Sequence, residues 1–166
     1  MDITIRAVRP EEHTALGEVT ARAYLADGLL EFGEADEYLV ALRDVARRAA
    51  EAEVLVAVDD TGRVLGGVAL AAGAGAGADL AGAGEAEIRM LAVDREARGR
   101  GAGEALVRAC VDRARAVPGC RRVVLSSHLA MAAAQRLYRR VGFDRTPARD
   151  WAPLPGVTLH TYGRDV

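Results

Sequence analysis

Residues 86 to 117 show the sharpest change of hydrophobic period along the chain. Over residues 87–93 the apolar side chains Ile88, Met90 and Ala92 alternate with residues 87, 89, 91 and 93, and this two-residue period predicts a β-strand. From Ala102 the apolar positions recur at helical spacing, with arginines between them, until Pro118 and Gly119. The pattern therefore predicts a strand, a turn rich in Arg and Gly, and a helix that begins inside the glycines.

Shorter periodic segments lie on both sides of this unit. Before it we expect a strand from Ile3, helices over 10–24 and 35–49, and a hairpin of strands 54–58 and 63–71. After it we expect a strand over 122–126, a helix over 130–141, a strand from Phe143, an irregular segment over 147–155 and a closing strand over 157–162. Because a helix separates strands 87–93 and 122–126, these two can lie parallel. The predicted fold class is α/β (α+β), with a mixed central sheet of about six or seven strands flanked by about four helices. We expect a single domain over residues 1–166.

Residues 73–84, GAGAGADLAGAG, form a low-complexity stretch without a regular apolar period. A loop that grips a ligand is one interpretation, but the stretch contains no basic residue. We expect instead a flexible connection that is partly disordered.

Composition narrows the functional classes. The net charge of −2 and the isoelectric point near 5.9 argue against a nucleic-acid-binding surface. Met1 is not followed by a basic segment and an apolar run, and residues 64–78 are too short and too rich in Gly to span a membrane. Cys110 and Cys120 are expected to be reduced structural thiols in a cytoplasmic protein. No residues have metal-ligand spacing, so we expect no metal.

The turn at residues 98–103 has a chemical use. Its three glycines let a ligand approach the backbone, beside the unpaired first N–H groups of the following helix. A pyrophosphate there would also meet the positive end of the helix dipole and the charges of Arg98 and Arg100. An ordinary glycine-rich turn is the alternative. A G-x-x-x-x-G-K loop is excluded because the chain has no Lys, and the dinucleotide pattern fails because Glu104 or Leu106 stands at its third Gly.

These motifs resemble the acetyl-CoA-binding core of the GNAT superfamily of N-acetyltransferases. The family signature R/Q-x-x-G-x-G/A appears as Arg98, Gly101 and Gly103, directly after the strand EIRMLAVD. Residues 132–143, AAAQRLYRRVGF, are similar to the family's A-x-x-L-Y-x-x-x-G-F helix and turn. The resemblance covers residues 86–143 in the expected order, whereas residues 1–85 match in layout.

The resemblance implies acetyl-CoA as the co-substrate. In the family, the strand before the signature splays from its parallel neighbour, and the pantetheine arm of the cofactor lies in the gap. The implied cofactor-binding positions are Leu91, Ala92 and Val93 on the strand and Arg98, Gly99, Arg100, Gly101, Ala102, Gly103 and Glu104 in the turn. Met131 stands where many members carry an Asn that bonds this arm, and Ser126 or Ser127 could supply a replacement hydroxyl.

The resemblance also implies catalytic residues. Tyr138 matches the general acid that protonates the departing thiolate, and its ordinary pKa of about 10 keeps its proton at neutral pH. Glu87 matches the glutamate that takes the amine proton through water in the histone-acetyltransferase branch, with Glu85 in reserve. The alternatives are packing for Tyr138 and a solvated side chain for Glu87. His128 is expected to be structural or solvated rather than a base.

The acceptor pocket is expected between the first two helices and the irregular tail. Its candidate walls are Tyr24, Phe32 and Trp151, with Tyr38 as a further aromatic, and the acids that could attract a cationic amine are Asp27, Glu31, Glu34 and Asp36. We expect an N-acetyltransferase that acts on a small-molecule amine or a peptide amino group, as a monomer or homodimer, without nucleic acid or membrane as partner. The alternatives are a non-catalytic acetyl-CoA-binding module and a transferase of a longer acyl group.

Overall fold

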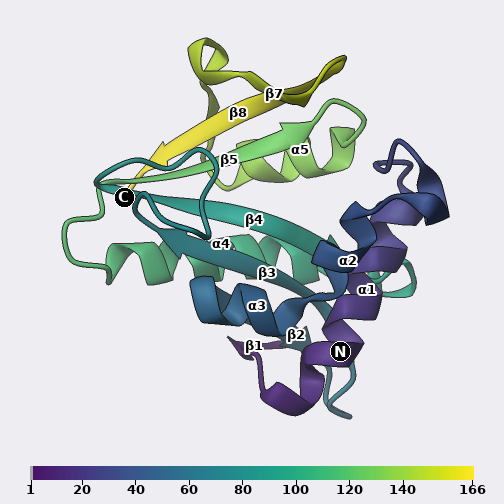
Figure 1. Ribbon diagram of the computed structural model, residues 1–166. Helices are drawn as coiled ribbons and strands as arrows, with labels where there is room; N and C mark the ends of the chain where they lie inside the picture. Colours follow the sequence, from purple (N-terminus) through teal and green to yellow (C-terminus); the bar gives the residue numbers. More distant parts are fainter. Residues whose placement is uncertain (1) are drawn as a thin grey trace.

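The computed structural model describes residues 2–166 and contains one mixed β-sheet with helices on both faces (Figure 1). The strands are β1 Thr4–Ala7, β2 Glu53–Val58, β3 Val64–Ala72, β4 Glu85–Val93, β5 Arg122–His128, β6 Asp144–Arg145, β7 Trp151–Leu154 and β8 Val157–Asp165. Their order across the sheet is β1-β2-β3-β4-β5-β8-β6, and β7 pairs with β8. Neighbouring strands in this order are antiparallel, except for β4 and β5, which are parallel.

The helices form a layer on each face of the sheet. They are α1 His13–Ala26, α2 Tyr38–Arg43, α3 Val45–Glu51, α4 Ala102–Arg115 and α5 Ala132–Arg140, with short 3-10 turns at Pro10–Glu12, Gly33–Ala35, Arg95–Ala97 and Pro147–Arg149. Leu106 of α4 and Tyr138 of α5 belong to one buried core on the sheet. Leu16 of α1 and Val45 of α3 belong to a second core on the opposite face. The amphipathic helices thus bury their apolar stripes against the two faces of one sheet.

Residues 35–49, predicted as one helix, form the separate helices α2 and α3. Asp44 lies between them in a non-helical conformation, and its side chain accepts the backbone N–H of Arg47 at 3.1 Å. This N-cap starts α3 afresh. The apolar spacing continues across the cap, so the hydrophobic pattern alone predicted a single helix.

The segment 147–155, predicted to be irregular, contains strand β7. Trp151 lies opposite Leu159 of β8, and Leu154 lies opposite Val157 across the turn of a hairpin. Residues 2–166 therefore contain eight strands and five α-helices, more than the expected six or seven strands and four helices. The predicted fold class, a mixed sheet flanked by helices, is confirmed.

Strand β4 is irregular just before its end. Met90 has a φ of 52°, which side chains rarely adopt, and the register with β3 shifts at this point. On β3, a Cβ atom at Gly66 would lie 2.5 Å from the carbonyl oxygen of Ala92. Glycine at position 66 therefore allows β3 to follow the bulged strand closely.

Strands β4 and β5 pair over only part of their length. Residues 85–88 lie opposite residues 122–125, and beyond them the strands run on to Val93 and His128 without pairing to each other. The expected parallel pairing and the separation of the two strand ends are both present. The sheet is therefore open between β4 and β5 at the carboxyl ends of these strands.

The low-complexity segment 73–84 has no helix or strand, but it follows a defined path against β4. The backbone N–H groups of Asp79, Leu80 and Ala81 donate to Oε1 of Glu87 at 3.0, 2.6 and 2.9 Å. A guanidinium N–H of Arg89 donates to the Gly77 carbonyl at 3.1 Å. The sequence predicted a connection without specific partners, whereas here a buried carboxylate of β4 accepts hydrogen bonds from the loop's amides.

Candidate functional site

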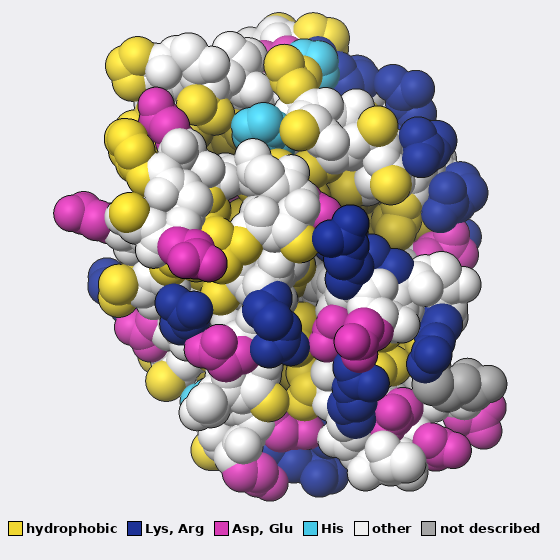
Figure 2. Space-filling model, turned by 90° about the vertical axis from the view of Figure 1, so that its right-hand side faces the viewer, with side chains coloured by type: hydrophobic (Ala, Val, Ile, Leu, Met, Phe, Trp, Pro, Cys, Tyr) yellow, Lys and Arg dark blue, Asp and Glu magenta, His cyan; other side chains and the backbone are white. Residues whose placement is uncertain are grey.

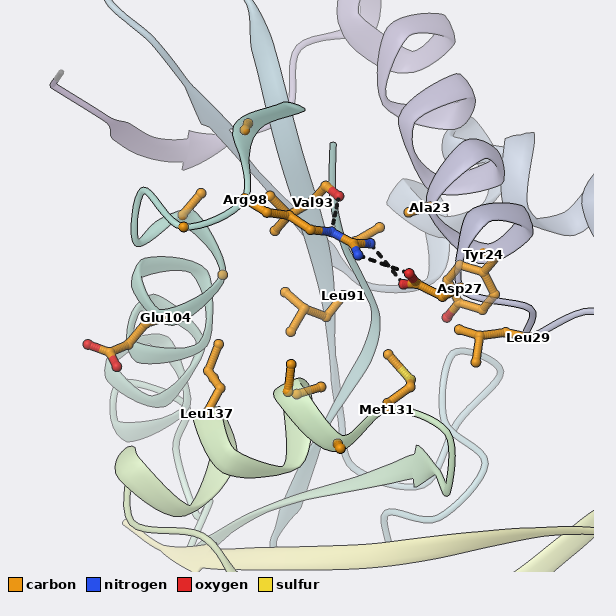
Figure 3. A pocket seen from close by; sticks show the side chains of 18 of the residues that line it. Ala23, Tyr24, Asp27, Leu29, Leu91, Val93, Arg98, Glu104, Met131 and Leu137 are labelled. Atoms are coloured by element: carbon orange, nitrogen blue, oxygen red, sulfur yellow. Dashed lines mark hydrogen bonds and ion pairs between the residues drawn. The ribbon is translucent and has the colours of Figure 1, made fainter. Parts of the chain in front are cut away.

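A cleft of about 510 Å³ opens where β4 and β5 separate. Its walls come from the end of β4, the glycine turn with the start of α4, the end of α1, and α5 with the two residues before it (Figure 3). Its lining residues are Ala23, Tyr24, Asp27, Leu29, Leu91, Ala92, Val93, Ala97, Arg98, Gly99, Gly101, Ala102, Gly103, Glu104, Ala130, Met131, Ala132, Ala133, Ala134, Leu137 and Arg140.

The glycine turn lies beside the cleft where α4 begins. Gly99 and Gly101 have φ angles of 82° and 85°, which disfavour any side chain, and a Cβ atom at either position would meet no atom within 4 Å. Gly101 caps α4, and the N–H of Ala105 donates to its carbonyl at 3.0 Å. The amides of residues 102–104 precede this bond and have no acceptor within the helix. The turn thus presents open backbone and the positive end of α4 to an anion.

The predicted cofactor positions come together at this cleft. All of them except Arg100 line it, both at the strand end over residues 91–93 and in the turn over residues 98–104. Arg100 is exposed and lies outside the lining.

Helix α5 supplies a wall that sequence reasoning missed. The stretch from Ala130 to Ala134 lines the cleft, and apart from Met131 its side chains are single methyl groups. These short side chains leave room for a ligand beside the start of the helix. The run AMAAA in the sequence is the signal that could have indicated this wall.

Two serines at the end of β5 differ in their partners. Oγ of Ser126 accepts the indole N–H of Trp151 at 2.8 Å. Ser127 is buried, and within residues 2–166 its Oγ has no hydrogen-bond partner. A buried polar atom without a partner is costly and calls for an explanation. Of the two serines considered as replacements for the Asn, Ser127 has the unpartnered hydroxyl within residues 2–166, but neither serine lines the cleft.

Arg98 spans the cleft to reach Asp27 at the end of α1 (Figure 3). Its Nη1 and Nη2 donate to the two carboxylate oxygens at 2.9 and 2.8 Å, and its Nε donates to the carbonyl of Val93 at 3.4 Å. The hydrogen bonds to Asp27 raise the pKa of Arg98, which keeps the guanidinium charged. Because Asp27 is already paired with a cation, it is not a free acid waiting for a cationic amine.

Tyr138 belongs to the core and not to the lining of the cleft. Its ring centroid lies 6.1 Å from that of Phe143 and 5.9 Å from that of Tyr162. Burial raises the pKa of Tyr138 above its ordinary value, so the phenol keeps its proton. The structure therefore gives Tyr138 the proton that an acid needs and also the packing of a core residue.

Tyr24 is a second phenol, and this one lines the cleft from α1. Burial raises its pKa, and nearby Tyr38 and Tyr138 raise it further. Sequence reasoning placed Tyr24 in the acceptor wall, and the structure places it where a ligand of the cleft would meet it.

Glu87 is 2% exposed, and both of its carboxylate oxygens are engaged. While Oε1 accepts the loop amides described above, Oε2 lies 3.7 Å from Nε of Arg89. The reserve candidate Glu85 accepts two hydrogen bonds from Arg149, at 2.7 and 2.9 Å. Since neither glutamate faces the cleft, their positions argue against a role as the general base.

The remaining acceptor candidates lie away from the cleft lining. Phe32 is 67% exposed in the loop between α1 and α2, and Trp151 is held on β7 by its bond to Ser126. His128 has a local partner, because its Nδ1 accepts the N–H of Ala130 at 3.0 Å. On the face drawn in Figure 2, arginines and acids are interspersed, and many apolar side chains lie in the upper half. Of the three residues predicted as acceptor walls, Tyr24 lines the cleft, whereas Phe32 and Trp151 do not.

Within residues 2–166, no helix is both long enough and apolar enough to cross a membrane. The same residues contain no group of three or more His, Cys, Asp or Glu side chains that could hold a metal ion.

Solved structures share this fold. A phosphinothricin acetyltransferase from Sinorhizobium meliloti, in complex with AcCoA, is 21% identical and matches 100% of this chain and 89% of its own with a TM-score of 0.74. A PaiA N-acetyltransferase from Thermoplasma acidophilum, in complex with coenzyme A, is 18% identical and matches 100% of both chains with a TM-score of 0.72. A GCN5-related N-acetyltransferase from Kribbella flavida is 23% identical, with coverages of 99% and 98% and a TM-score of 0.70. At these identities the likeness shows the fold.

Sequence comparison decides the family. A search of the curated proteins gave no significant match. The family model described as acetyltransferase (GNAT) family matches residues 18–143, more than half of the chain, and this range includes β4, the glycine turn, α4 and α5. The chain therefore belongs to the GNAT acetyltransferase family, as its motifs predicted.

Proposed function

We propose that this protein is an acetyl-CoA-dependent N-acetyltransferase, which passes an acetyl group directly to a primary amine of a small molecule or peptide in a ternary complex. The observation that carries the proposal is the cleft between the separated ends of β4 and β5, beside the open glycine turn and the N-terminus of α4. The relatives from S. meliloti and T. acidophilum, which share this fold, are complexes with AcCoA and with coenzyme A.

The residues of the cleft fit the parts of this cofactor. The open turn at Gly99 and Gly101, with the amides of residues 102–104, suits a pyrophosphate. The edge of β4 over residues 91–93 is unpaired toward β5, so its backbone groups suit the amides of the pantetheine arm.

Bound acetyl-CoA supplies the acetyl group as an activated thioester. When the acceptor nitrogen bonds to the acetyl carbon, the carbon–sulfur bond breaks and the sulfur requires a proton. In our proposal Tyr138 donates this proton from Oη, which burial keeps protonated at neutral pH. Tyr24, which lines the cleft and is also protonated, helps to position the reacting group.

The acceptor amine must be neutral before it can react. We assign Glu87 to holding the loop at residues 79–81, because its oxygens are occupied there. The amine proton then passes to water without a carboxylate of β4. The rate is expected to rise with pH until the acceptor is deprotonated, and to follow the pKa of the amine used.

The test starts with a panel of amines and peptides, using release of the CoA thiol as the readout. Tyr138→Phe keeps the packed ring, and we expect turnover to fall by roughly 100-fold with little change in acetyl-CoA affinity. Tyr162→Phe is the matched control, because the Tyr162 hydroxyl is buried in the same core without a partner among residues 2–166. Full turnover by both variants would remove Tyr138 from the mechanism and make Tyr24 the acid to test.

The same assay separates the alternatives. If the protein binds acetyl-CoA by calorimetry but no amine in the panel releases thiol, a non-catalytic binding module is the better description. If succinyl-CoA or a longer acyl-CoA reacts faster than acetyl-CoA, the donor assignment is wrong although the cleft assignment stands.

A further inference from the structure

The ion pair between Arg98 and Asp27 joins opposite walls of the cleft (Figure 3). Arg98 begins the glycine turn, whereas Asp27 is the C-terminal cap of α1, 71 residues away in the sequence. Both terminal nitrogens of the guanidinium are used by one carboxylate, and the third nitrogen is directed at the Val93 carbonyl. The arginine is therefore fixed in one place by Asp27 and by the end of β4.

The position of Asp27 is unfavourable for a carboxylate in two respects. A negative charge at the C-terminal end of a helix meets the negative end of the helix dipole, so Asp27 gains little from α1 itself. It also lines the same cleft as the turn at Gly99 and Gly101, which suits an anion. Arg98 offsets both unfavourable effects on the Asp27 charge, because it forms a bidentate ion pair with the carboxylate, and this geometry gives strong hydrogen bonds.

A carboxylate and a phosphate present similar pairs of oxygens to a guanidinium. Asp27 thus occupies the donors of Arg98 that a pyrophosphate in the turn would use, and it adds one negative charge to the cleft that the pyrophosphate must enter. We propose that Asp27 sets the cofactor affinity by competing with the pyrophosphate of CoA for Arg98. This inference rests on the proposed function. When CoA binds, the Arg98 guanidinium leaves Asp27 and pairs with the pyrophosphate. When CoA leaves, Arg98 pairs with Asp27 again.

An orienting role for Asp27 predicts the opposite sign. If Asp27 served to aim Arg98 at the phosphates, removal of the carboxylate charge would weaken CoA binding. Competition instead predicts tighter binding. The direction of one affinity change therefore decides between the two roles.

The experiment is a calorimetric titration of wild type and Asp27→Asn with CoA and with pantetheine, which carries no phosphate. We expect Asp27→Asn to bind CoA roughly three- to tenfold more tightly, the scale of a partly exposed ion pair, and pantetheine unchanged. Glu18→Gln is the matched control, because Glu18 also lies on α1 and pairs with Arg43 at 2.9 Å, outside the cleft lining. It should bind CoA as wild type does.

A double-mutant cycle with Asp27→Asn and Arg98→Gln measures the coupling between the two side chains separately from other structural effects of each substitution. In an Arg98→Gln background, Asp27→Asn should give no more than a minor part of its gain in CoA affinity, because the contested donors are gone. Unchanged or weaker CoA binding by folded Asp27→Asn would overturn the competition while leaving the proposed function intact. Failure of wild type to bind CoA at all would overturn the proposed function and the inference together.

Discussion

The two sides of β4 are built in different ways. On the cleft side the strand end at residues 91–93 and the glycine turn offer mainly backbone, with small side chains from α5 opposite. On the other side, Glu85, Glu87 and Arg89 alternate along the strand and hold the loop at residues 77–82 and the side chain of Arg149. On the cleft side, backbone groups remain without hydrogen-bond partners among residues 2–166, whereas on the loop side each of the three charged side chains has a hydrogen-bond or ion-pair partner.

This difference suggests that the cleft side of β4 serves ligand binding and that the loop side serves the stability of the fold. A site made of backbone N–H groups and glycines is sensitive to any added side chain but adds little to the stability of the fold. A cluster of buried charges with complete partners stabilises a loop, and loss of one partner leaves the others unsatisfied. Substitutions on the cleft side should therefore change affinity, and those on the loop side should change stability.

The largest effect is expected at Gly101. Gly101→Asp places a side chain and a negative charge where the pyrophosphate belongs, and we expect CoA binding to fall by more than roughly 100-fold in calorimetry. Gly62→Asp is the control, because Gly62 has a φ of 84° in the β2–β3 turn and its Cβ would also meet no atom within 4 Å. The two variants should lose similar stability. Retained CoA affinity in Gly101→Asp would place the cofactor site elsewhere.

The next effect, at Glu87, tests the loop side. Glu87→Ala removes the acceptor of three backbone N–H groups, and we expect a loss of about 3 kcal/mol in the free energy of unfolding, measured by urea denaturation. Glu87→Gln keeps an acceptor oxygen and should cost less. Its turnover should stay within about threefold of wild type, since our assignment gives Glu87 no proton to carry. A hundred-fold loss of turnover by a stable Glu87→Gln would restore the glutamate as the base.

The smallest effect is expected at Asp150, which is hydrogen-bonded to Arg145 and Thr161, and it concerns how the free energy of unfolding changes at acid pH. Asp150 accepts two bonds from Arg145 at 2.8 Å and one from the Thr161 N–H, and these bonds hold its pKa below the ordinary range. A pKa lowered on folding stabilises the protein at neutral pH, and this contribution is lost as the pH falls below about 4. Asp150→Asn should therefore be less stable at pH 7 and show a shallower loss of stability between about pH 4 and pH 2.

The control for this measurement is Asp165→Asn. Its carboxylate is 87% exposed in a 3.4 Å pair with Arg122, and an exposed pair contributes little. Urea denaturation over the same pH range should give a curve close to that of wild type. Parallel curves for Asp150→Asn and wild type would contradict the assignment of this acid sensitivity to Asp150.

The cleft side could be predicted from the sequence because its backbone geometry requires particular residue types at particular positions. A turn with positive φ at residues 99 and 101 needs glycine, and the alternating strand before it and the periodic helix after it are local patterns. The family signature at Arg98 placed the cofactor positions, and all except Arg100 line the cleft.

The loop side could not be predicted because its contacts join a strand to an aperiodic loop, and no repeating pattern in the sequence marks such contacts. The pattern at Glu87 suits a catalytic glutamate as well as a buried anchor, and only the position of residues 79–81 distinguishes the two. Asp27 likewise looks like a surface acid until Arg98 is brought against it. The cap at Asp44 was missed for a related reason, since a side chain that bonds its own backbone leaves the apolar period unchanged.

The short junction between β4 and β5 has a consequence for how long the protein lasts in a cell. Strands β1 to β4 are joined to β5, β8 and β6 through residues 85–88 and 122–125 alone within the sheet. A ligand seated across the gap stabilises the folded chain, by about 2.7 kcal/mol at one hundred times its dissociation constant, and so lowers the unfolded population about a hundredfold. Proteases that degrade the opened chain would then act less on the ligand-bound protein than on the ligand-free protein.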